Sequence, residues 1–166
     1  LWGVEDLLQL SETNPDKFMQ CLDVVNDVLI DICRDAIDNH GSDSLYMPDP
    51  TASGDLLSPH SFSALMNPIY QKFTKAMKDV PKFLHICGNT APFLMHAPDS
   101  GFDAFSFEAP GCVTYDAKRT IGDRMALIGS LETVRVMMLG TPELVYKEGL
   151  ENIRDGVDIL CPACGT

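Results

Sequence analysis

A histidine and a cysteine separated by one residue, His85 and Cys87, are the side chains of this sequence best suited to chemistry. They lie in a short apolar run that begins at Pro81 and ends at Gly88, which is typical of a buried β-strand. Alternate residues of a strand share one face, so both side chains are predicted to point the same way at its carboxyl end. Open α/β sheets and barrels place their chemistry at this end. For this pair alone, the alternative is a core histidine beside a buried free thiol.

A metal site needs further donors, and the remaining candidates also lie at predicted strand ends. Cys164 follows the last predicted strand and is carried toward the loop face, whereas Cys161 lies inside that strand. Glu108 ends another strand at its carboxyl end. Zinc accepts imidazole, thiolate and carboxylate ligands together, and a catalytic zinc site keeps one position exchangeable. This placement favours Cys164 over Cys161, with a Cys161-x-x-Cys164 redox pair as a further alternative.

Two polar residues near the same predicted strand ends are candidates for binding a substrate. Asp49 follows the first predicted strand and opens a turn-rich loop that runs to Asp55. Loops in this position commonly shape the substrate pocket of a barrel. Asn89 ends the strand that carries His85. We therefore expect Asp49 and Asn89 to bind substrate, and a capping role is the alternative for Asp49.

The elements that must position these residues alternate between helix and strand. Helices are predicted over 4–10, 15–41, 58–78, 90–97, 113–121 and 142–155, and strands over 44–48, 82–87, 102–108, 125–129 and 157–161. This order predicts right-handed βαβ units in a parallel sheet. A complete eightfold barrel typically needs about 250 residues, so about five strands fit its later part. The predicted fold class is α/β, the later part of a (β/α)8 TIM barrel, with a five-stranded doubly wound sheet as the alternative.

The composition of the chain indicates which cellular environment and which classes of partner to expect. The formal net charge of −12 disfavours nucleic acid and anionic membrane surfaces as partners. No stretch is long and apolar enough to span a bilayer. The six cysteines are irregularly spaced, so we expect reduced thiols and a cytoplasmic location. Open edges of a partial barrel invite pairing with another copy, and a homo-oligomer is a further expectation.

Longer motifs surround these residues and carry a family resemblance. They are Asp49-Pro-Thr-Ala-Ser-Gly-Asp-Leu-Leu-Ser-Pro59, Leu84-His-Ile-Cys-Gly-Asn-Thr90, Gly101-Phe-Asp-Ala-Phe-Ser-Phe-Glu108 and Asp158-Ile-Leu-Cys-Pro-Ala-Cys-Gly165. Together they resemble the uroporphyrinogen decarboxylase superfamily, and within it the methylcobamide:coenzyme M methyltransferases. The resemblance implies that residues 1–166 form a single domain that is part of such a barrel, without its N-terminal strands and last helix.

The resemblance also implies a function and a ligand set. The family's zinc signature falls on His85, Cys87 and Cys164. In that family, a carboxylate that can serve as fourth zinc ligand lies at the position of Glu108. The resemblance therefore implies a catalytic role for Glu108, in which it binds the zinc until the substrate thiol displaces it. The implied reaction moves a methyl group from a methylcobamide, supplied by a partner corrinoid protein, to a small thiol such as coenzyme M.

The sequence departs from the family pattern at two positions, and two other functions are alternatives to methyl transfer. Ala163 stands where the family usually has glycine, and the family usually has no cysteine at the position of Cys161. One alternative function is a metal-free enzyme like the classical uroporphyrinogen decarboxylases. The other is a non-catalytic partner of a corrinoid protein. A complete His-x-Cys…Cys set argues against the metal-free branch.

Overall fold

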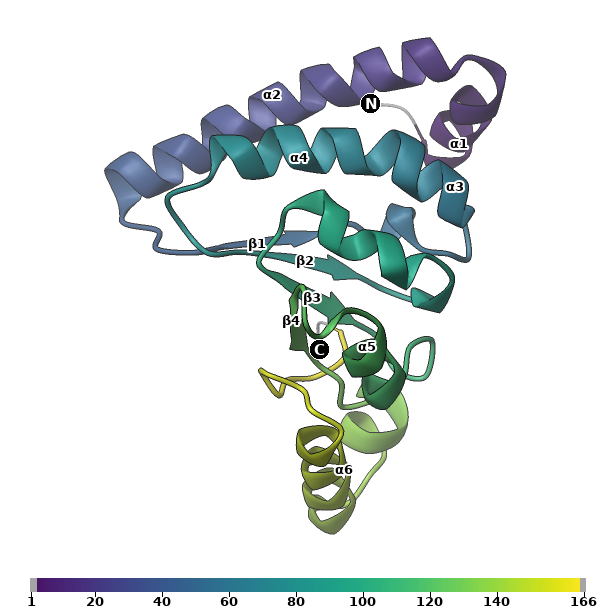
Figure 1. Ribbon diagram of the computed structural model, residues 1–166, viewed down its shortest axis with the longest axis vertical. Helices are drawn as coiled ribbons and strands as arrows, with labels where there is room; N and C mark the ends of the chain where they lie inside the picture. Colours follow the sequence, from purple (N-terminus) through teal and green to yellow (C-terminus); the bar gives the residue numbers. More distant parts are fainter. Residues whose placement is uncertain (1–2, 165–166) are drawn as a thin grey trace.

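A computed structural model describes residues 3–164 as alternating helices and strands (Figure 1). The α-helices are α1 (Val4–Thr13), α2 (Pro15–His40), α3 (Pro59–Ser61), α4 (Asn67–Ala76), α5 (Thr114–Ile121) and α6 (Pro142–Arg154). The 3₁₀ and π helices are η1 (Pro50–Ala52), η2 (Phe62–Met66), η3 (Ala91–Ser100) and η4 (Thr133–Met138). The strands are β1 (Leu45–Pro48), β2 (Lys82–Ile86), β3 (Ala104–Phe107) and β4 (Ala126–Ile128).

The four strands form one parallel sheet in the order β1-β2-β3-β4. The sheet order follows the chain order, so each strand is followed by a crossover that returns to its immediate neighbour. Pro48 pairs with His85, and His85 pairs with Ser106 in the next strand. All strands are parallel, so their carboxyl ends meet at one rim. This arrangement confirms the predicted α/β class with a parallel sheet.

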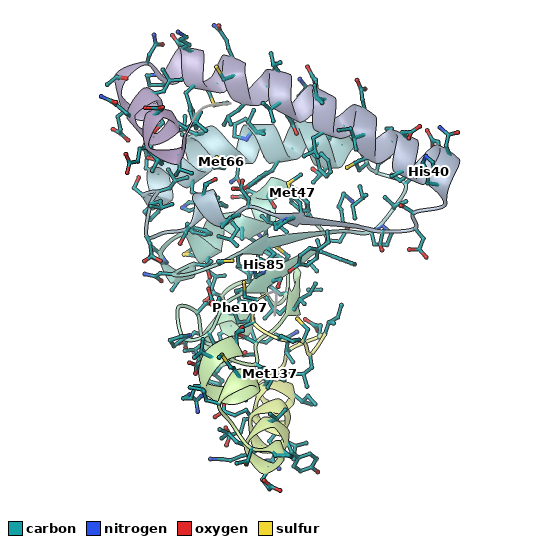
Figure 2. All side chains as sticks on the ribbon, turned by 180° about the vertical axis from the view of Figure 1, so that it is seen from behind. His40, Met47, Met66, His85, Phe107 and Met137 are labelled. Carbon is teal, nitrogen blue, oxygen red and sulfur yellow. The ribbon has the colours of Figure 1, made fainter. Side chains whose placement is uncertain are left out.

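Helices cover one face of the sheet and bury the hydrophobic core against it (Figure 1). Tyr70 and Phe73 of α4 pack with Leu84 and Ile86 of β2 in this core. Helix α2 lies beside α4, α4 contacts η3, and η3 contacts α5. Because side chains alternate along a strand, the helices on the Leu84 face leave His85 on the opposite face. Figure 2 shows His85 on the sheet, with Met47 of β1 and Phe107 of β3 on either side.

Local sequence signals explain where the longest helix begins and ends. The Asn14 side chain accepts a hydrogen bond from the Lys17 N–H, and Pro15 occupies the first turn of α2. Gly41 ends the helix with a left-handed φ of 74°. Further along, Asn67-Pro68 falls inside the helix predicted over 58–78, and a proline there removes a backbone donor. The helix changes at this point from the π-helical η2 to α4, which begins at Asn67. Within residues 3–164, no helix is long and apolar enough to cross a membrane.

The fifth predicted strand, over 157–161, does not form as a regular strand. This segment runs beside β4 and makes two isolated parallel bridges, Ile128 with Ile159 and Leu131 with Pro162. Between the bridged positions, Gly129 adopts a φ of 145°, a backbone conformation that interrupts a strand. The prediction of about five strands was therefore wrong by one, although the segment still follows β4 to the rim.

Candidate metal centre

Three soft donors converge at the carboxyl rim of the sheet. Ligand atoms of His85, Cys87 and Cys164 all lie within 4.8 Å of one another. The His85 Nε2 lies 3.1 Å from the Cys87 Sγ, and that sulfur lies 3.4 Å from the Cys164 Sγ. Together they supply one imidazole nitrogen and two thiol sulfurs, a donor set that zinc favours. The donor chemistry of these residues therefore fits the expected ion.

Secondary structure brings the three donors together from distant parts of the chain. His85 and Cys87 come from one face of β2 and its end, as their spacing predicted. Cys164 arrives along the segment beside β4, where the Ala163 N–H donates to the Leu131 carbonyl at 2.7 Å. This last bond places Cys164 at the rim even though the predicted fifth strand is irregular.

Burial shapes the protonation of two of the donors. Desolvation lowers the pKa of His85, although the charge of Glu108 and the hydrogen-bonding contact with Ser106 oppose it, so the imidazole is neutral near pH 7. Desolvation raises the pKa of Cys87 to about 11, with further contributions from Cys164 and from the charge of Glu108. The Cys87 thiol is therefore protonated near neutral pH, and a bound cation would displace its proton.

Glu108 lies beside the three donors but is held by a backbone contact. Its Oε2 accepts a hydrogen bond from the Gly88 N–H at 2.7 Å. Its charge is close enough to raise the pKa values of both His85 and Cys87. Among the described residues, however, Glu108 is not part of the group whose ligand atoms lie within 4.8 Å of one another. In this geometry, Glu108 fixes the backbone that follows Cys87.

Comparison with known proteins gives the family. The sequence profile of the uroporphyrinogen decarboxylase (URO-D) family matches residues 2–166. The chain belongs to this family. It is 32% identical over 163 residues to the methylated-thiol–coenzyme M methyltransferase of Methanosarcina mazei, and the match covers 98% of this chain and 43% of that protein. It is 31% identical over 165 residues to the methylcobamide:CoM methyltransferase MtaA of Methanosarcina barkeri, covering 99% and 48% respectively.

A solved structure agrees with these sequence matches. A methyltransferase from Methanosarcina mazei superposes with a TM-score of 0.91 and 32% sequence identity, over 98% of this chain and 48% of that one. The expected fold class, a portion of a URO-D-type (β/α)8 barrel, and the resemblance to methylcobamide:coenzyme M methyltransferases are thereby confirmed. This URO-D family chain spans about half the length of the curated relatives it matches.

In the structure of this URO-D family chain, the Asp49 N–H donates to the His85 carbonyl at 2.8 Å, whereas its side chain contacts α4 and the loop after β1. The Tyr70 hydroxyl of α4 donates to the Asp49 Oδ2 at 2.8 Å, and the Thr51 hydroxyl donates to its Oδ1 at 2.7 Å. Asp49 and Thr51 line a mainly apolar cavity of about 210 Å³ with residues of α1 and α2, such as Leu8 and Phe18. These contacts hold Asp49 between β1 and the helices, and a substrate-binding role for Asp49 stays a prediction.

Asn89, the other predicted substrate-binding residue, lies at the rim near Cys87. Its N–H donates to the Asp55 Oδ2 at 3.0 Å, and its carbonyl accepts from the Gly54 N–H at 2.9 Å. The backbone of Asn89 is thus fixed by the loop after β1, and the side chain is partly exposed. A substrate-binding role for Asn89 stays a prediction.

The other cysteines of the last motif do not form a redox pair in this structure. The Cys161 thiol donates to the Pro162 carbonyl at 3.0 Å, whereas the Cys164 sulfur contacts Cys87. All six cysteines of the chain are free. Of the two candidates for third donor, the geometry selects Cys164.

Sequence reasoning missed two residues that contact His85 directly. Ser106 of β3 places its Oγ 2.9 Å from the His85 Nδ1. Tyr46 of β1 stacks on the imidazole, with ring centroids 5.8 Å apart and an interplanar angle of 21°. Strand alternation puts Ser106 and Glu108 on one face, but only the strand register sets Ser106 opposite His85. A serine or tyrosine in a short strand carries no signal of its own for this role.

Proposed function

We propose that this chain is part of an enzyme that transfers a methyl group from a methylated corrinoid protein to a small thiol, with zinc held by His85, Cys87 and Cys164. The observation that carries the proposal is the convergence of these three donors within 4.8 Å. The relatives support the reaction class, because they are named as methyltransferases that act with methylcobamide or coenzyme M. Coenzyme M is accordingly the acceptor that we propose first.

The proposed reaction requires a thiolate near the three donors. A free thiol has a pKa of about 8.5 and is mostly protonated at neutral pH. Zinc, when bound, supplies the Lewis acidity that deprotonates a thiol at neutral pH. In the net reaction a sulfur–carbon bond forms, the cobalt–carbon bond breaks with its electron pair left on cobalt, and the thiol proton is released. The chain's contribution is to hold the donors in place and to bring the thiol to the rim.

Glu108 has two possible roles in this proposal, and each requires a different set of contacts for its carboxylate. As a fourth ligand that the substrate displaces, its carboxylate must reach the metal, either through Oε1 or by releasing the Gly88 N–H from Oε2. As a structural residue, it keeps that hydrogen bond at 2.7 Å and fixes the strand end that carries Cys87. We propose the ligand role for the substrate-free protein, since the Glu108 charge already acts on both His85 and Cys87.

The test combines zinc content with a methyl-transfer assay. Cys87→Ser and Cys164→Ser each remove one of the soft donors, so we expect both variants to lose stoichiometric zinc and the transfer of methyl groups from methylcobalamin to coenzyme M. Cys33→Ser is the matched control, because Cys33 lies in α2, packs against the hydrophobic core and is not one of the three converging donors. Unchanged zinc content in both test variants would refute the metal assignment. Zinc binding without methyl transfer would refute the proposed reaction and favour the non-catalytic alternative.

A further inference from the structure

Ser106 is a buried polar residue that faces the histidine of the proposed metal site. Its side chain comes from β3, directly opposite His85 of β2 in the parallel register. Ser106 is 1% exposed and His85 is 4% exposed, so water does not replace a missing partner for either group. The Ser106 Oγ lies 2.9 Å from the His85 Nδ1. The opposite ring nitrogen, Nε2, lies 3.1 Å from the Cys87 sulfur.

Tyr46 of the edge strand β1 completes this arrangement. Its ring stacks on the imidazole of His85, and its hydroxyl donates to the Ser106 Oγ at 3.4 Å. The stack restricts tilting of the imidazole out of its plane, and Ser106 restricts rotation within that plane. The flanking strands β1 and β3 thus each contribute one residue to the orientation of the ring that β2 carries.

We propose that Ser106, supported by Tyr46, is a positioning residue that orients His85 so that its Nε2 faces Cys87 and Cys164. The inference rests on the proposed metal site and adds to it the residue that sets one ligand's orientation. A neutral imidazole carries one N–H, and the other nitrogen keeps a lone pair. When the Nδ1–H donates to the Ser106 Oγ, the lone pair of Nε2 points toward the two sulfurs and is free to bind a cation.

The expected size of the effect follows from outer hydrogen-bond partners of metal ligands in general. Removing such a partner typically lowers metal affinity by about 10- to 100-fold. Ser106→Ala should therefore weaken zinc binding by a factor in this range, measured by competition with a chromophoric chelator. Ser106→Thr keeps the hydroxyl and should restore most of the affinity. Tyr46→Phe keeps the stack and loses only a long hydrogen bond, so its affinity should change less than that of Ser106→Ala.

Ser100→Ala is the matched control. Ser100 is also a wholly buried serine, and its hydroxyl donates to the Ala97 carbonyl at the end of η3. Its loss should leave zinc affinity unchanged. Equal affinity for Ser106→Ala and the unmodified protein would overturn the proposal. An equal loss in Ser106→Ala and Ser106→Thr would also overturn it, because packing rather than the hydroxyl would then be responsible.

A second measurement keeps the proposal testable if Ser106→Ala fails to fold. Nitrogen NMR of the zinc-loaded, unmodified protein reports which ring nitrogen carries a proton and which binds metal. We expect a protonated Nδ1 and a metal-bound Nε2 for His85, and metal bound at Nδ1 would contradict the proposal. If the unmodified protein takes up no zinc, the proposed metal site itself fails, which is distinct from either outcome for Ser106.

Discussion

His85 and Cys87 are held in states that differ in their readiness to bind a cation. The lowered pKa of buried His85 leaves a neutral imidazole, which is the form that binds metal. Cys87 has a pKa raised to about 11, so its thiol must lose a proton before it can bind metal. At this site the histidine is ready to bind, and the cysteine sets the dependence of binding on pH.

Zinc affinity should therefore rise with pH across the neutral range. At pH values below the Cys87 pKa of about 11, zinc must displace the Cys87 proton. This displacement alone should weaken the apparent zinc affinity by about tenfold for each unit by which the pH is lowered. Chelator competition between about pH 6 and pH 8 measures this slope. Cys87→Ser should reduce the slope together with the affinity. A flat profile for the unmodified protein would show that the Cys87 thiolate is not a ligand.

At the scale of elements, two loops clamp the strand end that carries the donors. Gly88 has a left-handed φ of 72°, and a Cβ there would lie 2.6 Å from the Asp55 Oδ2 and 2.8 Å from the Ser53 Oγ. From the other side, Gly111 approaches so closely that a Cβ on it would collide with the Gly88 backbone. The loops after β1 and β3 thus leave room only for glycine beside Cys87.

Gly88→Ala should destabilise the fold and the metal site together. A left-handed alanine costs about 1–2 kcal/mol, and crowding against Asp55 and Ser53 adds about 1–3 kcal/mol. Gly41→Ala is the control, because Gly41 has a similar φ of 74° but nothing within 4 Å of the added Cβ. Chemical denaturation should show a smaller loss for Gly41→Ala, and zinc affinity should fall only for Gly88→Ala. Equal losses of stability in the two variants would contradict the clamp.

The sequence predicts the elements more completely than the contacts between them. Strand alternation is a local property, so the shared face of His85 and Cys87 could be predicted from their spacing. Strand register and backbone exceptions are not local. Ser106 meets His85 through the register, and the positive φ of Gly129 interrupts the end of the fourth predicted strand, beside which the fifth should pair. The hydrogen bond between Glu108 and Gly88 likewise depends on how two strand ends lie side by side.

At the scale of the whole molecule, strand β1 lies at one edge of the sheet that the described residues form, and it is short and contains a proline. The N–H groups of Leu45 and Asp49 bond to carbonyls on the β2 side, so the backbone nitrogens of residues 46 and 48 face outward. Pro48 has no N–H, and strand β1 spans only four residues. Short edges and prolines oppose pairing between copies. The predicted homo-oligomer through this edge stays a prediction, and these features and the net charge of −12 weaken it.

Pro48→Val should increase self-association by restoring an outward donor on the edge. We expect sedimentation velocity to show larger species at high protein concentration for this variant than for the unmodified protein. Added salt should strengthen the difference, because it screens repulsion between acidic copies. Leu45→Val, which changes a side chain of the same strand and no edge donor, is the control. Identical sedimentation of Pro48→Val and the unmodified protein would show that Pro48 does not protect this edge.

The account depends most on a single cation bound by one nitrogen and two sulfurs of this chain. X-ray absorption at the zinc edge of the loaded protein measures this coordination directly. We predict one zinc ion per chain, with two sulfur neighbours at about 2.3 Å and one imidazole nitrogen at about 2.0–2.1 Å. A spectrum without sulfur neighbours, or a protein that takes up no stoichiometric zinc, would contradict the proposed centre.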